Sequence, residues 1–163
     1  MVEGELDPHP ARARLHCRDA AGGGQQPTPQ RVDEGLRPHE LAIFVRSSAE
    51  VPRAEAVAKQ ASVAYLLLDE RMETRHNRLS IMTMHLAKGL EFRAVVVMAC
   101  DDEVIPSQER IESVTDESDL EDVYQTERHL LYVACTRARD QLLVTGVEPG
   151  SEFLADMNAP KPT

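Results

Sequence analysis

Short apolar runs recur from residue 41 onward and predict a series of buried strands. Each run has five or six residues and is rich in β-branched or aliphatic side chains, a composition typical of strands that pack on both faces. The runs are Leu41–Val45, Val63–Leu68, Leu79–Thr83, Ala94–Met98 and Gln141–Thr145.

Amphipathic stretches between these runs predict helices. Ser47 or Ser48 is expected to cap a first helix that has Pro52 near its first turn. A longer helix is expected to open at Ser118–Glu121, which has the spacing of a capping box. Its apolar positions share one face, at spacings of three, four and seven: Leu120, Val123, Tyr124, Leu130, Leu131 and Ala134. A short last helix is expected over Ser151–Met157.

This alternation of strands and helices predicts an α/β fold, with a mostly parallel sheet of about five strands flanked by helices. The folded domain is expected over residues 39–158. Residues 1–38 hold five of the ten prolines and five of the eight glycines and show no hydrophobic period, so a disordered or loosely attached leader is expected there. Residues 159–163 are expected to form a disordered tail.

Composition narrows the class of protein. A length of 163 residues suits one domain. No apolar run approaches the roughly 20 residues that a membrane helix needs, so no membrane partner is expected. Cys17, Cys100 and Cys135 are odd in number and lack C-x-x-C spacing. We therefore expect neither a disulfide framework nor a metal site, and we expect a cytoplasmic location.

The charge of the chain is concentrated in one segment. The formal net charge is −10, whereas a nucleic-acid-binding domain usually has a basic face. Asp101–Glu127 holds eleven acidic residues and a single basic one, Arg110, and the rest of the chain is neutral. The acidity is therefore local and leaves room for a DNA-binding surface elsewhere, although this chain alone is expected to bind DNA weakly.

A polar segment follows the strand predicted at Leu79–Thr83. Thr83–Phe92 reads T-M-H-L-A-K-G-L-E-F. Polar loops after parallel strands lie at the edge where open α/β folds bind ligands. Thr83 and His85 can donate to a phosphate, and Gly89 permits a positive φ or a close backbone approach. A solvated turn with a glycine helix cap is the alternative that the residues leave open.

A second segment ends the long predicted helix. Glu127–Arg139 reads E-R-H-L-L-Y-V-A-C-T-R-A-R. Cations at a helix end are favoured by the helix dipole, which accounts for Arg139 and is one interpretation of Arg137. Arg128 is expected to be structural, for example by bonding carbonyls of the Thr83–Phe92 loop. Glu127, Leu130, Leu131 and Tyr132 fit core packing and helix orientation.

In this order, about forty residues apart, the two segments resemble motifs V and VI of superfamily 1 DNA helicases of the UvrD/Rep type. The resemblance covers roughly residues 40–157 and implies the C-terminal part of the second RecA-like motor domain of an ATP-driven DNA translocase. It implies that Arg137 is an arginine finger that reaches the γ-phosphate of ATP. It also implies that Gly89 and Glu91 lie near the nucleotide, and that Thr83 and His85 face single-stranded DNA.

Three further features compare the chain with the helicase family: the position of Arg46, the short spacing between Arg46 and Thr83, and the departures from the family pattern in the second segment. Arg46 ends the first strand and is expected to contact DNA or another domain, or else to be a solvated strand end. Only about 37 positions separate Arg46 from Thr83, so the chain resembles the compact members of the family that lack the large helical insertion. His129 stands where the family usually has a second arginine, and Ala134 and Cys135 replace a glycine and an aliphatic residue.

The chain contains no G-x-x-x-x-G-K-[ST] phosphate-binding loop. ATP with Mg²⁺ is therefore expected to bind jointly with an N-terminal P-loop motor domain, in cis or in trans, and the isolated chain is expected to be inactive. Two alternatives stay open: a non-catalytic, helicase-derived interaction module, and a truncated gene product without independent activity.

Overall fold

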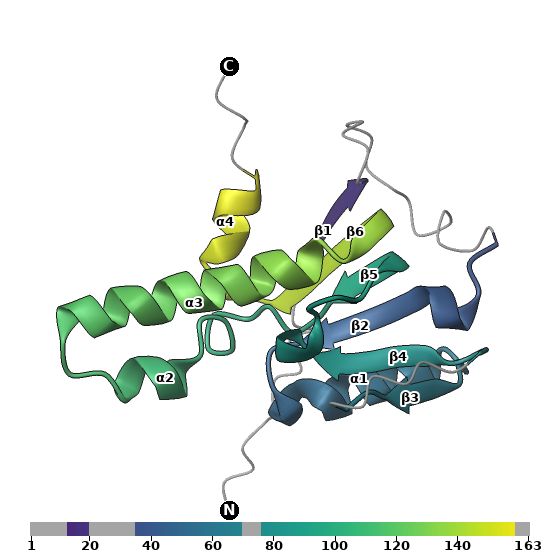
Figure 1. Cartoon of the computed structure of the whole chain (residues 1–163), viewed down its shortest axis with the longest axis horizontal. Helices are drawn as coiled ribbons and strands as arrows, with labels where there is room; N and C mark the ends of the chain where they lie inside the picture. Colours follow the sequence, from purple (N-terminus) through teal and green to yellow (C-terminus); the bar gives the residue numbers. More distant parts are fainter. Residues whose placement is uncertain (1–12, 20–34, 70–75, 159–163) are drawn as a thin grey trace, which may run out of the picture.

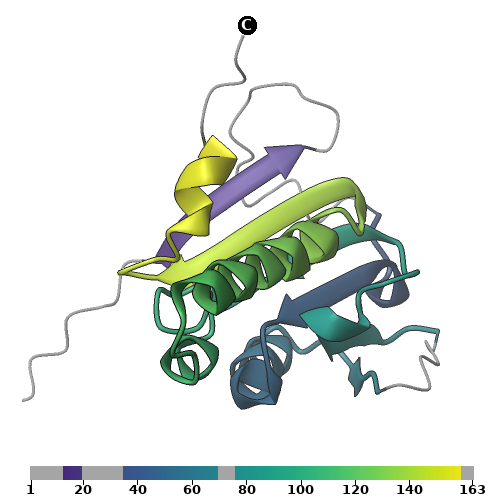
Figure 2. The same ribbon diagram turned by 60° about the vertical axis from the view of Figure 1, so that its left-hand side comes forward.

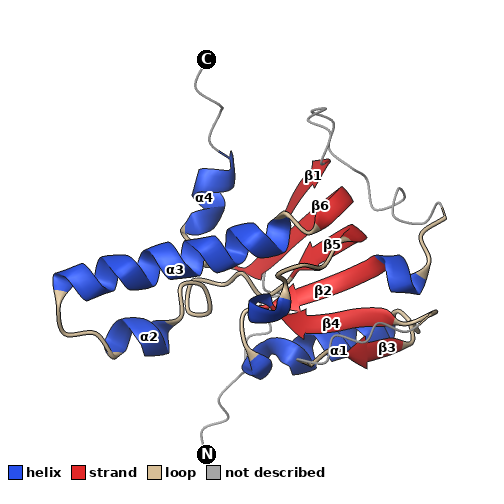
Figure 3. Cartoon of the chain, in the orientation of Figure 1, coloured by secondary structure: helices blue, strands red, loops and turns tan. Residues whose placement is uncertain are grey.

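A computed structural model describes residues 13–19, 35–69 and 76–158 of the chain. Within these ranges six strands form one sheet in the order β1-β6-β5-β2-β4-β3 (Figure 3). The strands are β1 Ala13–Asp19, β2 Leu41–Val45, β3 Tyr65–Leu67, β4 Leu79–Thr83, β5 Phe92–Val97 and β6 Ala138–Val147. Five of them run parallel, and β1 pairs antiparallel with β6. The predicted α/β fold with a mostly parallel sheet is confirmed.

Helices cover both faces of the sheet (Figures 1 and 2). The α-helices are α1 Val51–Gln60, α2 Gln108–Glu112, α3 Glu117–Cys135 and α4 Phe153–Asn158, and the 3-10 turns are η2 Pro38–Glu40, η3 Ser48–Glu50 and η4 Met84–Leu86. No helix in these ranges has both the length and the apolar content to cross a bilayer.

The strands divide their side chains between two cores, as the period-two alternation of a strand requires. On one face Ala42 and Phe44 of β2 pack with Leu131 and Ala134 of α3. On the other face Ile43 and Val45 of β2 pack with residues of α1. The sheet is thus buried on both sides, which explains the continuous apolar runs in the sequence.

Several element bounds agree with the sequence expectations. β2 and β4 have the predicted bounds, and Ser47 caps the first helical turn by accepting from the Ala49 amide at 3.2 Å. β3 is shorter than expected. β6 is longer, because β5 pairs with its residues 138–144 and β1 pairs with its residues 141–147.

Two features differ from the expectations. The long helix is capped by Asp116 and not by Ser118: Asp116 has extended backbone angles, and its carboxylate accepts from the Ser118 amide at 3.2 Å. In addition, β1 lies within the segment expected to be a disordered or loosely attached leader. Its pairing with β6 uses main-chain groups, which need no hydrophobic period to be present. The rest of that leader up to residue 34, and the expected tail, lie outside the described residues.

Because β2 to β6 run parallel, their carboxyl ends lie along one side of the sheet and their amino ends along the opposite side; these sides are called the carboxyl edge and the amino edge. The carboxyl ends of β2 and β4 lie at one edge, where β2 continues into Arg46 and β4 ends at Thr83. The amino ends of β5 and β6 lie at the other edge, where Phe92 pairs with Ala138. The segment from Met84 to Glu91 runs from the carboxyl edge to the amino edge, on the face covered by α3.

Candidate functional site

The candidate residues fall into two groups at these two edges. Thr83, His85 and Arg46 lie at the carboxyl edge: Val45 pairs with Thr83, so Arg46 emerges beside the start of η4. Gly89, Glu91 and Arg137 lie at the amino edge, next to the starts of β5 and β6. The structure therefore separates residues that are close together in the sequence.

At the carboxyl edge, Arg46 is held by a buried carboxylate. Its guanidinium donates to both oxygens of Glu127, from Nε at 2.5 Å and from Nη2 at 2.6 Å. Arg46 is only 6% exposed and Glu127 is fully buried. The solvated strand end considered for Arg46 is therefore wrong, because two charges removed from water require a partner.

Two further donors converge on Glu127. The Ser107 amide donates to Oε2 at 3.2 Å, and Arg110 Nη1 of α2 donates to Oε1 at 2.9 Å. Burial alone would raise the pKa of Glu127. The bonds and charges of Arg46 and Arg110, with the Ser107 amide, outweigh it and lower the pKa below its ordinary value. Glu127 is thus ionised at neutral pH and joins β2, α2 and α3.

His85 is exposed on η4, close enough to this cluster to respond to its charges. Partial desolvation lowers the pKa of His85 most, and the charges of Arg46 and Arg110 lower it further, whereas Glu127 opposes them. The ring is therefore mainly neutral at pH 7 and can offer one N–H donor.

At the amino edge, Arg137 lies in the two-residue turn between α3 and β6. Its Nε donates to the Val133 carbonyl at 3.2 Å, its Nη1 to the Leu90 carbonyl at 3.3 Å and its Nη2 to Thr136 Oγ1 at 3.2 Å. Its own carbonyl accepts from the Phe92 amide at 3.0 Å. Arg137 thereby ties the end of α3 to the loop that contains Gly89.

The Gly89–Glu91 loop has the geometry that its glycine allows. Gly89 has φ +81°, and a Cβ at this position would meet nothing within 4 Å. The positive φ expected for Gly89 is present. Glu91 is exposed and lines a pocket of about 260 Å³ together with His39, Glu40, Phe92, Arg93 and Arg139.

One expectation for α3 needs correction. Tyr132 is 65% exposed and does not pack in the core, because it lies on the outward side of the helix. Arg128 makes a structural contact, as expected: its guanidinium carbon lies 4.8 Å from the centre of the Phe153 ring. The Leu90 carbonyl of the Thr83–Phe92 loop accepts from Arg137. Arg139 bonds Asp140 at 3.0 Å on the exposed side of β6.

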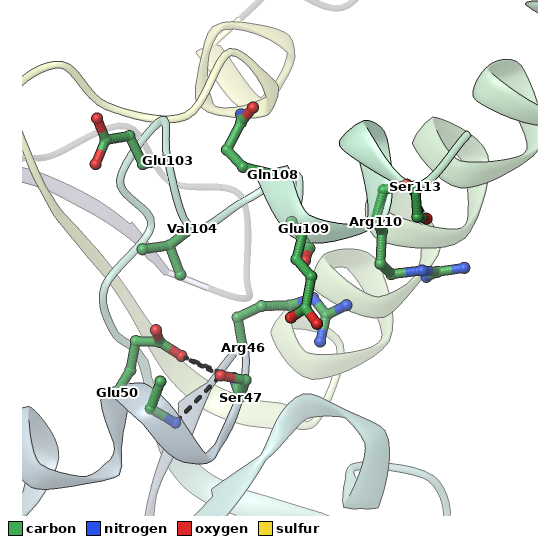
Figure 4. A pocket seen from close by; sticks show the side chains of 11 residues that line it. Arg46, Ser47, Glu50, Glu103, Val104, Gln108, Glu109, Arg110 and Ser113 are labelled. Carbon is green, nitrogen blue, oxygen red and sulfur yellow. Dashed lines mark hydrogen bonds between the residues drawn. The ribbon is translucent and has the colours of Figure 1, made fainter. Parts of the chain in front are cut away.

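A larger pocket of about 490 Å³ opens beside the Arg46–Glu127 pair, between α2 and the β2–η3 connection (Figure 4). Arg46, Ser47 and Arg110 line it together with three acidic residues, Glu50, Glu103 and Glu109. Glu50 is engaged, because its carboxylate accepts from Ser47 Oγ at 2.8 Å and from the Ser47 amide.

Sequence reasoning missed the role of Glu127 as the centre of a charge cluster, and it missed Arg110. Signals for both were present. Glu127 lies four positions from Val123 and from Leu131 in the buried stripe of α3, and a charge in such a stripe requires a partner. Arg110 is the single base in an acidic segment.

Comparison with known proteins shows which family the chain is related to. The family model of the UvrD-like helicase C-terminal domain matches residues 39–148. An ATP-dependent DNA helicase Rep from Buchnera aphidicola is 32% identical over 89 residues, which are 55% of this chain and 13% of that protein. An ATP-dependent DNA helicase PcrA from Staphylococcus aureus is 42% identical over 69 residues, which are 42% of this chain and 9% of that protein.

A solved structure is also similar. It is the C-terminal domain of a possible DNA helicase from Lactobacillus plantarum, with a TM-score of 0.49 and 28% identity, and the match covers 73% of this chain and 63% of that one. The chain spans 13% or less of the length of the two curated relatives described above. Because the family model covers more than half of the chain, the protein belongs to the UvrD-like helicase C-terminal domain family.

Proposed function

We propose that this chain is the C-terminal motor domain of an ATP-dependent DNA helicase or translocase. The observation that carries this proposal is the division of the candidate residues between two edges of one sheet, joined by the short segment from Thr83 to Glu91. A nucleotide at the amino edge and DNA at the carboxyl edge would both contact this segment. The relatives Rep and PcrA are ATP-dependent DNA helicases, which supports both ligands.

Arg137 is the proposed arginine finger. Three of its five N–H donors are used on Val133, Leu90 and Thr136. No acceptor for the other two is recorded among the described residues. The bonds to main-chain carbonyls fix the guanidinium before any ligand arrives, and the remaining donors can bind phosphate oxygens. A guanidinium placed in this way stabilises the charge on a transferring phosphoryl group.

Glu91 and Gly89 are proposed to lie beside the same nucleotide. The exposed Glu91 carboxylate can accept from a ribose hydroxyl, and the open space at Gly89 allows a close approach to its backbone. Within the described residues no three His, Cys, Asp or Glu side chains gather to hold a metal ion. Because the sequence has no G-x-x-x-x-G-K-[ST] loop, we assign Mg²⁺ and the phosphate-binding loop to an N-terminal P-loop motor domain that completes the site.

Thr83 and His85 are proposed to contact the backbone of single-stranded DNA. Both lie at the carboxyl edge, and the single donor of a neutral His85 ring suits a phosphate oxygen. Arg46 belongs to this face as well. However, its guanidinium is committed to Glu127, so it shapes the face more than it binds there.

The test compares the isolated chain with the same chain mixed with or fused to a P-loop motor domain of this helicase type. The chain alone should release phosphate from ATP no faster than buffer, and the assembly should show DNA-stimulated release. Replacing Thr83 and His85 together by alanine in the assembly should weaken binding of oligo(dT) and oligo(dA) to the same extent, because phosphate contacts carry no base information. Weakening confined to one of the two sequences would contradict the assignment.

A further inference from the structure

Arg110 is the single basic residue in the acidic segment Asp101–Glu127, and only one of its guanidinium nitrogens has a recorded hydrogen bond within the described residues. Its Nη1 donates to Glu127 Oε1 at 2.9 Å, yet 40% of its side chain stays exposed. A guanidinium has five donors. Within the described residues no second acceptor is recorded for the Arg110 side chain. Arg110 is thus anchored at one nitrogen and open at the others.

The charge balance around Glu127 leaves Arg110 in excess. The Glu127 carboxylate is already bound at both oxygens by Arg46. One negative charge cannot neutralise two guanidinium groups, so the cluster of Arg46, Arg110 and Glu127 carries one surplus positive charge. That charge faces solvent at Arg110, because Arg46 is buried. An exposed, pre-oriented guanidinium matches a phosphate oxygen better than any other common anion-binding side chain does.

The surplus charge lies beside the proposed DNA face. The charges of Arg110 and Arg46 both act on His85, and Arg110 and Arg46 line the same pocket at the carboxyl edge. A strand that contacts Thr83 and His85 would therefore pass close to Arg110.

The acidic residues of this pocket limit where an anion can bind. Glu50 is engaged with Ser47, whereas no partner within the described residues is recorded for the carboxylates of Glu103 and Glu109. Figure 4 shows Glu103 and Arg110 on opposite sides of the pocket. The figure also draws Glu109 between them, so both carboxylates repel an anion inside the pocket. A phosphate is therefore favoured only on the side of Arg110 that faces away from Glu109.

We propose that Arg110 is a further DNA-contacting residue, which donates to a backbone phosphate next to the one held by Thr83 and His85, and that Glu127 positions it. The inference rests on the proposed function, since it extends the same DNA face onto α2. It assigns a binding role to the acidic segment, which would otherwise only repel DNA.

The test measures binding of fluorescein-labelled oligo(dT) to the 163-residue chain by anisotropy, starting at low ionic strength and repeated at increasing salt. Arg110→Gln should weaken binding and reduce the slope of log K against log salt by about 0.7, the value of one phosphate contact on single-stranded DNA. Arg110→Lys should restore most of the slope, because the charge is kept. Circular dichroism melts establish that each variant is folded, and Glu127 keeps its Arg46 partner throughout.

The matched control is Arg53→Gln. Arg53 is also bound to a carboxylate, that of Asp101, and is 41% exposed, but it belongs to α1 on the other face of the sheet. Its replacement removes the same charge and should leave the slope unchanged. If Arg110→Gln and Arg53→Gln have equal effects, Arg110 contributes only general charge and the inference is wrong.

The double replacement of Thr83 and His85 by alanine separates the inference from the proposed function. If it weakens binding while Arg110→Gln matches the control, the proposed DNA face stands and the role of Arg110 is wrong. If it has no effect while Arg110→Gln weakens binding, DNA binds at α2 and the proposed face is wrong. Absence of binding at the lowest salt, both to the chain alone and to its assembly with a P-loop motor domain, would overturn both.

Discussion

Arg137 and Arg139 are two positions apart and are held in different ways. The Arg137 guanidinium lies against main-chain carbonyls of α3 and of the Gly89 loop, whereas Arg139 bonds the neighbouring Asp140 at the surface. Carbonyl acceptors fix an arginine without neutralising it, but a carboxylate neutralises it. At the residue scale, this difference favours Arg137 over Arg139 as the group that meets a phosphate.

Gly89 offers a second test at this scale. Gly89→Ala should lower the free energy of unfolding by about 1–2 kcal/mol, because φ +81° is unfavourable for a residue with a Cβ. Gly35→Ala is the matched control, with φ +86° and equally open surroundings. Urea unfolding should show similar losses for both variants.

Only Gly89→Ala should also lower ATP turnover in the assembly with a P-loop motor domain, since the added methyl group would occupy the space proposed for the nucleotide. Equal turnover in the two glycine variants would contradict the placement of Gly89 beside the nucleotide.

At the scale of elements, α3 links the two edges of the sheet. Glu127 in its middle holds Arg46 and Arg110, and the turn after its last residue holds Arg137. Glu127→Ala would leave Arg46 buried without its carboxylate, and should lower the free energy of unfolding by about 3–5 kcal/mol. Replacing Arg46 and Glu127 together by methionine should cost much less, because no unpaired charge remains.

The pH dependence of stability tests the same pair. The pKa of Glu127 is lowered in the folded protein, so its contribution is present above its ordinary value of 4.5 and is lost as the pH falls through the folded-state value. The difference in melting temperature between the natural protein and Glu127→Gln should therefore shrink as the pH is lowered below 4.5. A constant difference down to pH 2 would contradict an ionised Glu127.

Elements with a strong hydrophobic pattern could be predicted from the sequence, and those stabilised by main-chain or polar contacts could not. β2 and β4 are buried on both faces and have the predicted bounds. β1 pairs with β6, and main-chain pairing leaves no hydrophobic period to read. α2 is a short polar helix held by the contacts of Ser107 and Arg110 with Glu127.

The candidate site shows the same limit. The residue types in Thr83–Phe92 and Glu127–Arg139 were readable in the sequence. Their division between two edges was not, because it depends on the direction in which Met84–Glu91 crosses the sheet. The buried stripe of α3 indicates that Glu127 needs a partner, but Arg46 lies 81 positions away, so no local pattern could identify it as that partner.

At the scale of the whole molecule, the carboxyl ends of β2 and β4 and the amino ends of β5 and β6 lie at opposite edges of one sheet (Figure 1), and each edge has one group of candidate residues. The Leu90 carbonyl near the end of the Thr83–Glu91 segment accepts from Arg137, and Thr83 at the start of the segment lies beside Arg46. A movement of this segment at one edge would therefore shift residues at the other edge. Such an arrangement suits a domain in which nucleotide and DNA act on each other. The acidic net charge of −10 fits a domain that holds DNA together with a partner.

The most direct test of this account is the rate of DNA-stimulated ATP hydrolysis by the chain joined to a P-loop motor domain, with Arg137→Lys compared with Arg139→Lys. Arginine fingers contribute roughly 10³–10⁵ in turnover, and lysine cannot reproduce their fork. Arg137→Lys should therefore reduce turnover by orders of magnitude while DNA binding persists, and Arg139→Lys should change it little. Equal rates in the two variants, or near-full activity of Arg137→Lys, would contradict the assignment.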